Sequence, residues 1–105
     1  MIITVTRSLL AALTLSVTTH TASAADDYTT ELYDIYCTTC HAVAASGAPQ
    51  AFTREWQERV DKGISTLVNN AINGTGNMPP MGTCGECSAA DLENLIRYMA
   101  QEQQP

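Results

Sequence analysis

The sequence predicts an all-α domain built of short helices, and three observations support this prediction. Apolar residues recur at helical spacing in several separate segments. The stretches between these segments are rich in Gly, Pro and Asn, which favour turns and loops. No segment has the alternation of apolar and polar residues that is expected of a half-buried strand. The 105 residues are enough for one small domain.

The amino-terminal residues 1–24 have the features of a cleaved secretory signal peptide. A positively charged start precedes an apolar run over residues 8–17, which is too short to span a bilayer comfortably. Ala22-Ser23-Ala24 then supplies the small residues that a signal peptidase requires, so cleavage is expected before Ala25 or before Asp26. We therefore expect an exported protein without stable membrane insertion after cleavage. A retained amphipathic anchor is the alternative.

Cleavage would leave one small acidic domain over residues 25–105. Loss of Arg7 leaves four basic residues against 11 acidic ones, and thus a net charge of −7. Nucleic acids and anionic membranes both require a basic face, so the charge argues against them as partners. One Phe and one Trp provide little aromatic bulk for a core. Because so small a domain is marginally stable by itself, we expect something else to fill its centre.

The first helix is predicted over residues 27–39. Its apolar residues follow the i, i+4, i+7, i+8 spacing of one helix face: Tyr28, Leu32, Ile35 and Tyr36. Asp26 and Asp27 provide a cap and negative charge at its start. A loop should follow over residues 42–52, because Ser46-Gly47-Ala48-Pro49 favours turns.

Two helices are predicted in the middle of the chain. Thr53 can cap a short helix that runs through Lys62 and stops at Gly63. The next helix ends at Asn73-Gly74. Its apolar stripe consists of Ile64, Leu67, Val68, Ala71 and Ile72.

The carboxyl-terminal part combines an irregular loop with a final helix. Residues 73–87 contain four Gly and two Pro, which predicts a loop. Ser88 and Asp91 resemble a capping box with Asp in place of Glu. The last apolar stripe consists of Leu92, Leu95, Ile96 and Met99. Four short helices and two long loops would leave the centre poorly filled, so we expect them to wrap around a large flat ligand.

The motif Cys37-Thr38-Thr39-Cys40-His41 identifies that ligand as a c-type haem. Two thiols on one helical turn can add to the two haem vinyl groups, and the His that follows can then ligate the iron. His41 is the only His that remains after removal of the signal peptide, because His20 is lost. A second axial His is therefore unavailable within the monomer.

A methionine is the expected second axial ligand. Met78 lies in the sequence Asn77-Met78-Pro79-Pro80-Met81, and the prolines stiffen the chain on its carboxyl side. Met81 is the alternative, but it precedes Gly82 and its backbone is less restrained. Met99 lies on the last apolar stripe, which already explains it as a core residue. The sequence therefore favours Met78.

Other interpretations remain open, among them a haem-free disulfide protein. A thioredoxin-like redox pair would need a βαβ setting, which this helical chain lacks. A four-Cys zinc site could also use Cys84 and Cys87, but the two pairs lie much farther apart than in a zinc ribbon, and an exported setting disfavours free thiolates. A haem enzyme or gas-binding protein would need an open iron position, whereas Met78 is available to close it.

Together these motifs resemble the class I c-type cytochromes, and within them the cytochrome c5 type. The resemblance covers nearly all of residues 28–100. Its parts are Cys37-x-x-Cys40-His41, Gly47-Ala48-Pro49, Trp56, Met78-Pro79-Pro80, Cys84-x-x-Cys87 and the helix from Ser88 to Ala100. It implies a small class I cytochrome c fold, with three to five short helices wrapped around one covalent haem. It also implies His–Met ligation and a periplasmic single-electron carrier rather than an enzyme.

The resemblance assigns roles to further residues. Pro49 matches the family's proline whose carbonyl accepts a hydrogen bond from the ligand His. Trp56 is either a core residue or an N–H donor to a haem propionate. Cys84 and Cys87 lack a following His, and a local disulfide between them fits both the family and an exported protein. From the charge we expect redox partners that present a basic patch.

Overall fold

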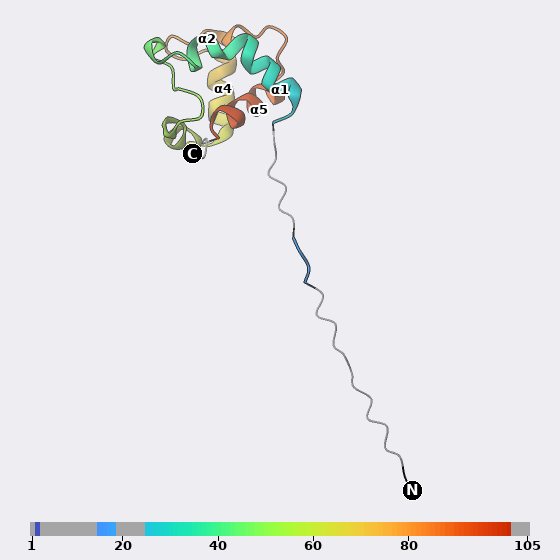
Figure 1. Cartoon of the computed structure of the whole chain (residues 1–105). Helices are drawn as coiled ribbons and strands as arrows, with labels where there is room; N and C mark the ends of the chain where they lie inside the picture. Colours follow the sequence, from blue (N-terminus) through green and yellow to red (C-terminus); the bar gives the residue numbers. More distant parts are fainter. Residues whose placement is uncertain (1, 3–14, 19–24, 102–105) are drawn as a thin grey trace.

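The computed structural model describes residues 2, 15–18 and 25–101, and its helices gather in the last of these ranges (Figure 1). Most of the predicted signal peptide therefore lies outside the described residues. Leu15 and Val17, which belong to its apolar run, are 80% and 79% exposed. Among the described residues, no helix is long and apolar enough to cross a bilayer.

Short helical elements make up the regular structure of the described chain, apart from one isolated bridge between Thr75 and Met78. In chain order they are α1 (Asp27–Leu32), η1 (Tyr33–Cys37), α2 (Thr38–His41), η2 (Ala44–Ser46), η3 (Arg54–Trp56), α3 (Gln57–Val60), α4 (Ile64–Asn73), η4 (Pro80–Thr83) and α5 (Ala89–Met99). The predicted all-α fold is thus confirmed.

The first three elements form one continuous helix, in which η1 has π-helical geometry. Asp26 caps its start, because its carboxylate accepts a hydrogen bond of 2.7 Å from the Thr29 amide. The predicted apolar stripe is only partly correct. Leu32 is buried as expected, and Ile35 and Tyr36 line the pocket described below. Tyr28 is instead 49% exposed, and Tyr33, which lies outside the predicted stripe, is buried.

The helix α5 forms the centre of the core, since it packs against both α4 and α1 (Figure 1). Leu92, Leu95, Ile96 and Met99 are all buried on it, as its apolar stripe predicts. The predicted capping box is confirmed: Ser88 accepts a hydrogen bond from the Asp91 amide, and the Asp91 carboxylate accepts one from the Ser88 amide.

An aromatic cluster joins the first helix to the end of α5. The rings of Tyr33, Phe52 and Tyr98 contact one another edge to face, with centroids 5.1 to 5.7 Å apart. The Phe52 amide also donates a hydrogen bond of 2.7 Å to the Met99 carbonyl. These contacts fix the loop after His41 against α5, and so fix the position of the helix end that carries His41.

The segment around Trp56 differs slightly from the helix predicted between Thr53 and Lys62. It consists of the 3₁₀ turn η3 followed by the short helix α3. Thr53 is the N-cap residue, as predicted, but its side chain accepts no hydrogen bond from the helix, and its hydroxyl donates to the Gln50 carbonyl at 2.7 Å. This hydrogen bond draws the start of the segment toward the loop that precedes it.

Candidate haem-binding site

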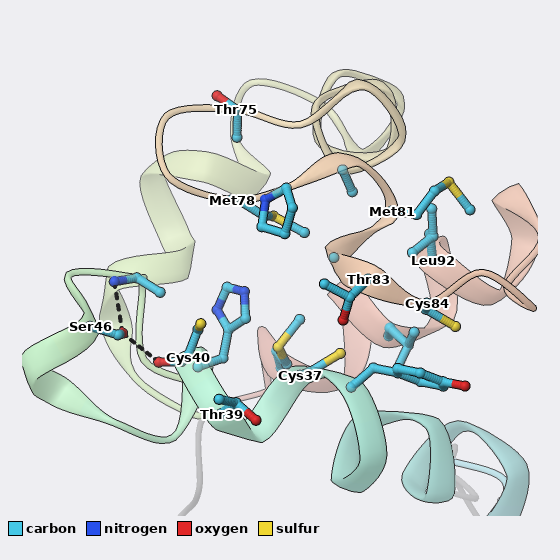
Figure 2. Close-up of a pocket in the computed structure, with 18 of the residues that line it drawn as sticks. Cys37, Thr39, Cys40, Ser46, Thr75, Met78, Met81, Thr83, Cys84 and Leu92 are labelled. Carbon is cyan, nitrogen blue, oxygen red and sulfur yellow. Dashed lines mark hydrogen bonds between the residues drawn. The ribbon is translucent and has the colours of Figure 1, made fainter.

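A pocket of about 400 Å³ lies between α2, α5 and the loop that includes η4 (Figure 2). This volume is in the range of cofactor sites. Apolar side chains of α4 and α5 form much of its wall: Ala71, Leu92, Leu95, Ile96 and Met99. Most of these residues also belong to the hydrophobic core, so the pocket is the centre of the fold and not a surface groove.

His41 enters the pocket from the end of α2 and is 7% exposed. Its Nδ1 lies 2.8 Å from the Pro49 carbonyl oxygen. A carbonyl oxygen can only accept, so Nδ1 carries the hydrogen of the neutral ring and the lone pair remains on Nε2. The imidazole is thus held in the tautomer and orientation that a metal ligand requires.

The loop over residues 42–52 is folded back onto the helix that carries His41. The Ala51 amide donates to the His41 carbonyl at 2.8 Å, and the Ser46 hydroxyl donates to the Cys40 carbonyl at 2.6 Å. The Gln50 side-chain amide lies within 2.9 to 3.2 Å of three carbonyl oxygens, those of Cys40, Val43 and Ala48. Gln50 thus supports the loop that follows His41, and this role was not predicted from the sequence. The position of Gln50 directly after Pro49 is the feature that could have indicated it.

Trp56 supports the His41 ring from outside the pocket. The indole is 5% exposed, and its centroid lies 5.7 Å from that of the imidazole. Its single N–H donates a hydrogen bond of 2.9 Å to the Gln50 carbonyl. The indole has one hydrogen to donate and Gln50 accepts it in this structure, which supports the core alternative for Trp56. The alternative role, as a donor to a haem propionate, stays a prediction.

Cys37 and Cys40 lie on the pocket wall, one helical turn apart, with their thiols free (Figure 2). Burial raises the pKa of the Cys37 thiol to about 11, so this thiol remains protonated at neutral pH. An active redox cysteine would instead need a readily formed thiolate. Within the described part of the chain, no three side chains among His, Cys, Asp and Glu gather into a metal site.

Met78 approaches the pocket from the opposite side (Figure 2). Its backbone pairs with that of Thr75 through two hydrogen bonds, of 3.1 Å from the Thr75 amide and 2.9 Å from the Met78 amide. Met81 also lines the pocket, but it lies farther along the loop, beside Leu92 (Figure 2). Met99 is 4% exposed in the core of α5, where the sequence predicts it. Sequence reasoning missed the part that Thr75 has in holding Met78.

The structure joins Cys84 and Cys87 in a disulfide, with Cα atoms 5.5 Å apart. Both residues are buried, at 1% and 8% exposure. The bond closes the turn between the Met78 loop and α5 and leaves these sulfurs unavailable as thiolate ligands. The arrangement therefore disfavours a four-Cys zinc site.

The donor set and the wall fit a covalently bound haem. An imidazole with a free Nε2 and a thioether enter one apolar pocket from separate segments, and two thiols lie on its wall at the spacing that haem attachment requires. A cofactor held between His41 and Met78 would also contact the apolar side chains of α5, which accounts for a pocket at the centre of so small a core.

Comparison with known proteins gives the same family. Residues 24–99 match the family model described as cytochrome c oxidase, cbb3-type, subunit III. Cytochrome c5 of Ectopseudomonas mendocina is 38% identical over 68 residues, which cover 62% of this chain and 78% of that protein. Cytochrome c5 of Azotobacter vinelandii is 34% identical over 68 residues, which cover 62% of this chain and 82% of that protein.

A solved structure shares the fold. It is one chain of the crystal structure of an electron transfer complex of nitrite reductase with cytochrome c, with a TM-score of 0.65 and 28% identity. The match covers 73% of this chain and 95% of that chain. The resemblance to cytochrome c5 that the motifs indicate is confirmed by these relatives. The chain therefore belongs to the c-type cytochrome family that the matching model describes, with the cytochromes c5 among its relatives.

Proposed function

We propose that this protein is a periplasmic single-electron carrier that holds one covalent haem between His41 and Met78. One observation carries the proposal: an oriented imidazole and a thioether enter the same apolar pocket, and two free thiols at the attachment spacing lie on its wall. Membership of the c-type cytochromes supports the haem, and the two cytochrome c5 relatives support an electron carrier rather than an enzyme.

In this proposal the protein residues hold the cofactor and keep its surroundings constant. Cys37 and Cys40 form the thioether bonds, and His41 supplies Nε2 to the iron while Pro49 keeps its ring oriented. When bound, the haem supplies an iron that accepts and releases one electron. Met78 would supply its thioether sulfur to the iron and would thereby exclude other ligands. The apolar wall and the thioether both favour the reduced state and raise the reduction potential.

The covalent attachment is tested by replacing the two thiols. In the full chain expressed with haem-maturation machinery, Cys37→Ala/Cys40→Ala should abolish haem staining after denaturation. The matched control is Cys84→Ala/Cys87→Ala, which should keep the stain. Haem staining that persists in the first variant would overturn the assignment. In the unreduced protein, Cys84 and Cys87 should resist alkylation, because we propose that they form a disulfide.

The proposed partner is a redox protein with a basic patch, because the charge of this chain is strongly segregated. Segments 25–53 and 74–92 contain no Lys or Arg but carry the carboxylates of Asp26, Asp27, Glu31, Asp34, Glu86 and Asp91. In contrast, residues 54–62 contain three acidic and three basic residues. The acidic segments meet beside the pocket, where partial burial and the nearby Glu86 carboxylate raise the pKa of Tyr36, a residue that also lines the pocket wall. An electron transfer complex is known for the solved structural relative, which supports a protein partner.

Salt should therefore slow electron transfer to the partner, since ions screen attraction beyond about 10 Å at 0.1 M salt. Glu31→Gln/Asp34→Asn should weaken this salt dependence. Glu58→Gln/Asp61→Asn removes the same charge from the balanced segment and should weaken it less. A rate that stays flat or rises with ionic strength would contradict the proposed partner.

Export to the periplasm rests on residues 1–24, whose apolar run includes the exposed Leu15 and Val17. The mature protein should begin at Ala25 or Asp26 in the periplasmic fraction, as mass spectrometry would show. A full-length chain in the membrane fraction would indicate a retained anchor instead.

A further inference from the structure

The turn Met81-Gly82-Thr83, which follows Met78 in the pocket loop, has a left-handed backbone at three consecutive residues. The φ angles are +61°, +56° and +68°. Such angles are uncommon for residues with a Cβ and are rarest for β-branched residues such as Thr83. Two of the three residues therefore adopt a conformation that only surrounding structure can maintain.

Contacts on both sides hold this turn in place. The Gly82 amide donates to the Pro79 carbonyl at 2.9 Å, and the Cys84 amide donates to the Met81 carbonyl at 3.0 Å. Cys84 is almost fully buried, at 1% exposure, and is bonded to Cys87. The turn is thus fixed between the stiff Pro79-Pro80 pair and a buried disulfide.

The turn brings Gly82 against the end of the Met78 side chain. A Cβ at position 82 would lie 3.1 Å from the Met78 methyl carbon, Cε, which is closer than ordinary van der Waals contact. Met78 is therefore fixed at two points: its backbone pairs with Thr75, and its methyl group lies against Gly82. A methyl carbon fixed at that place limits the directions in which the adjacent sulfur can point.

We propose that Gly82 is a positioning residue, which the left-handed turn Met81–Thr83 presents to the Met78 methyl group so that the thioether points into the pocket. The proposal rests on the function proposed above, in which Met78 is an axial ligand. A side chain at position 82 would displace Met78 rather than unfold the protein, because the end of a Met side chain is flexible and can move.

The test compares Gly82→Ala with Gly63→Ala in the haem-loaded full chain. Both glycines have a positive φ, +56° and +98°, so both variants lose stability to backbone strain. A Cβ at position 63 would meet nothing within 4 Å, and Gly63 is not among the residues that line the pocket. Gly82→Ala should weaken the absorption band of the iron–thioether bond and raise the apparent affinity for carbon monoxide about tenfold, as the population of open iron increases. Gly63→Ala should change neither.

A double-mutant cycle with Met78→Ala identifies the cause. This substitution removes the methyl group that Gly82 contacts, so Gly82→Ala should alter carbon monoxide affinity less than about twofold in that background. If Gly82→Ala alone does not fold, the Met78→Ala background should restore folding. Equal spectra for the Gly82 and Gly63 variants, or a full Gly82→Ala effect without Met78, would overturn the positioning role. A Met78→Ala variant that keeps the band would overturn the ligand assignment itself.

Discussion

The two sides of the pocket are built in different ways. On one side, a continuous helix carries Cys37, Cys40 and His41, and hydrogen bonds from a single loop support its end. On the other side, Met78 lies on a chain of tight turns without a helix beneath it. The helical side uses regular backbone geometry, whereas the loop side depends on glycines, prolines and a disulfide.

This difference shows two ways to hold a ligand atom in place. The imidazole is fixed by side-chain contacts, with Pro49 at its Nδ1 and the Trp56 ring beside it. The thioether is fixed mainly through the backbone around it, at Gly74, Thr75 and Gly82. Substitutions that remove side-chain volume should therefore damage the helical side most, and substitutions that add a Cβ should damage the loop side most.

The largest effect is expected from a substitution on the helical side of the pocket. Trp56→Ala should lower the free energy of unfolding by about 4 kcal/mol, because it leaves a cavity beside His41. Trp56→Phe keeps most of the ring volume and loses the hydrogen bond to Gln50, so it should cost about 1 kcal/mol. Denaturant titration of the haem-loaded protein measures both. Equal losses for the two variants would show that the indole volume does not support the site.

The next largest effect is expected from a substitution on the loop side of the pocket. A Cβ at Gly74 would lie 2.9 Å from the Met78 carbonyl oxygen and 3.0 Å from the Pro80 nitrogen, and these backbone atoms cannot easily move. Gly74→Ala should therefore cost about 3 kcal/mol. Gly47 has nearly the same φ, +78° against +80°, and open space around it, so Gly47→Ala should cost only about 1 kcal/mol. A similar loss in both variants would show that the close approach at Gly74 has no effect.

The smallest effect is expected from a substitution that relieves backbone strain on the loop side. Thr83 lines the pocket and is β-branched, and its φ is +68°. Thr83→Gly should raise the free energy of unfolding by about 0.5 kcal/mol, since relief of the left-handed backbone exceeds the added freedom of the unfolded chain. Thr66→Gly, on the exposed face of α4, should instead lower it by about 1 kcal/mol. Destabilisation by Thr83→Gly would mean that its backbone is not strained.

The sequence predicts the helical side better than the loop side, for a physical reason. Apolar spacing and caps determine where helices occur, so α4, α5 and the Ser88 capping box could be predicted. The π-helical segment η1 could not, because apolar spacing assumes a regular α-helical turn throughout. The haem motif is contiguous, which makes Cys37, Cys40 and His41 visible as one site.

On the loop side, only Met78 and its prolines give a pattern that can be recognised. The pairing of Thr75 with Met78 has no periodicity, and the left-handed backbone at Met81 and Thr83 contradicts the usual preference of residues with a Cβ. The contact of Gly82 with the Met78 methyl group depends on these features together. Such geometry arises from tertiary structure and cannot be predicted from local sequence.

The central claim is that the iron is held between His41 and Met78, and carbon monoxide binding tests it most directly. The haem-loaded protein should show the thioether band in its oxidised form. In its reduced form it should not bind carbon monoxide. Met78→Ala should lose the band and bind carbon monoxide, whereas Met81→Ala should behave like the unsubstituted protein. The reverse pattern would move the ligand to Met81. Carbon monoxide binding by the unsubstituted protein, with neither substitution altering it, would contradict the claim and favour a gas-binding protein or haem enzyme.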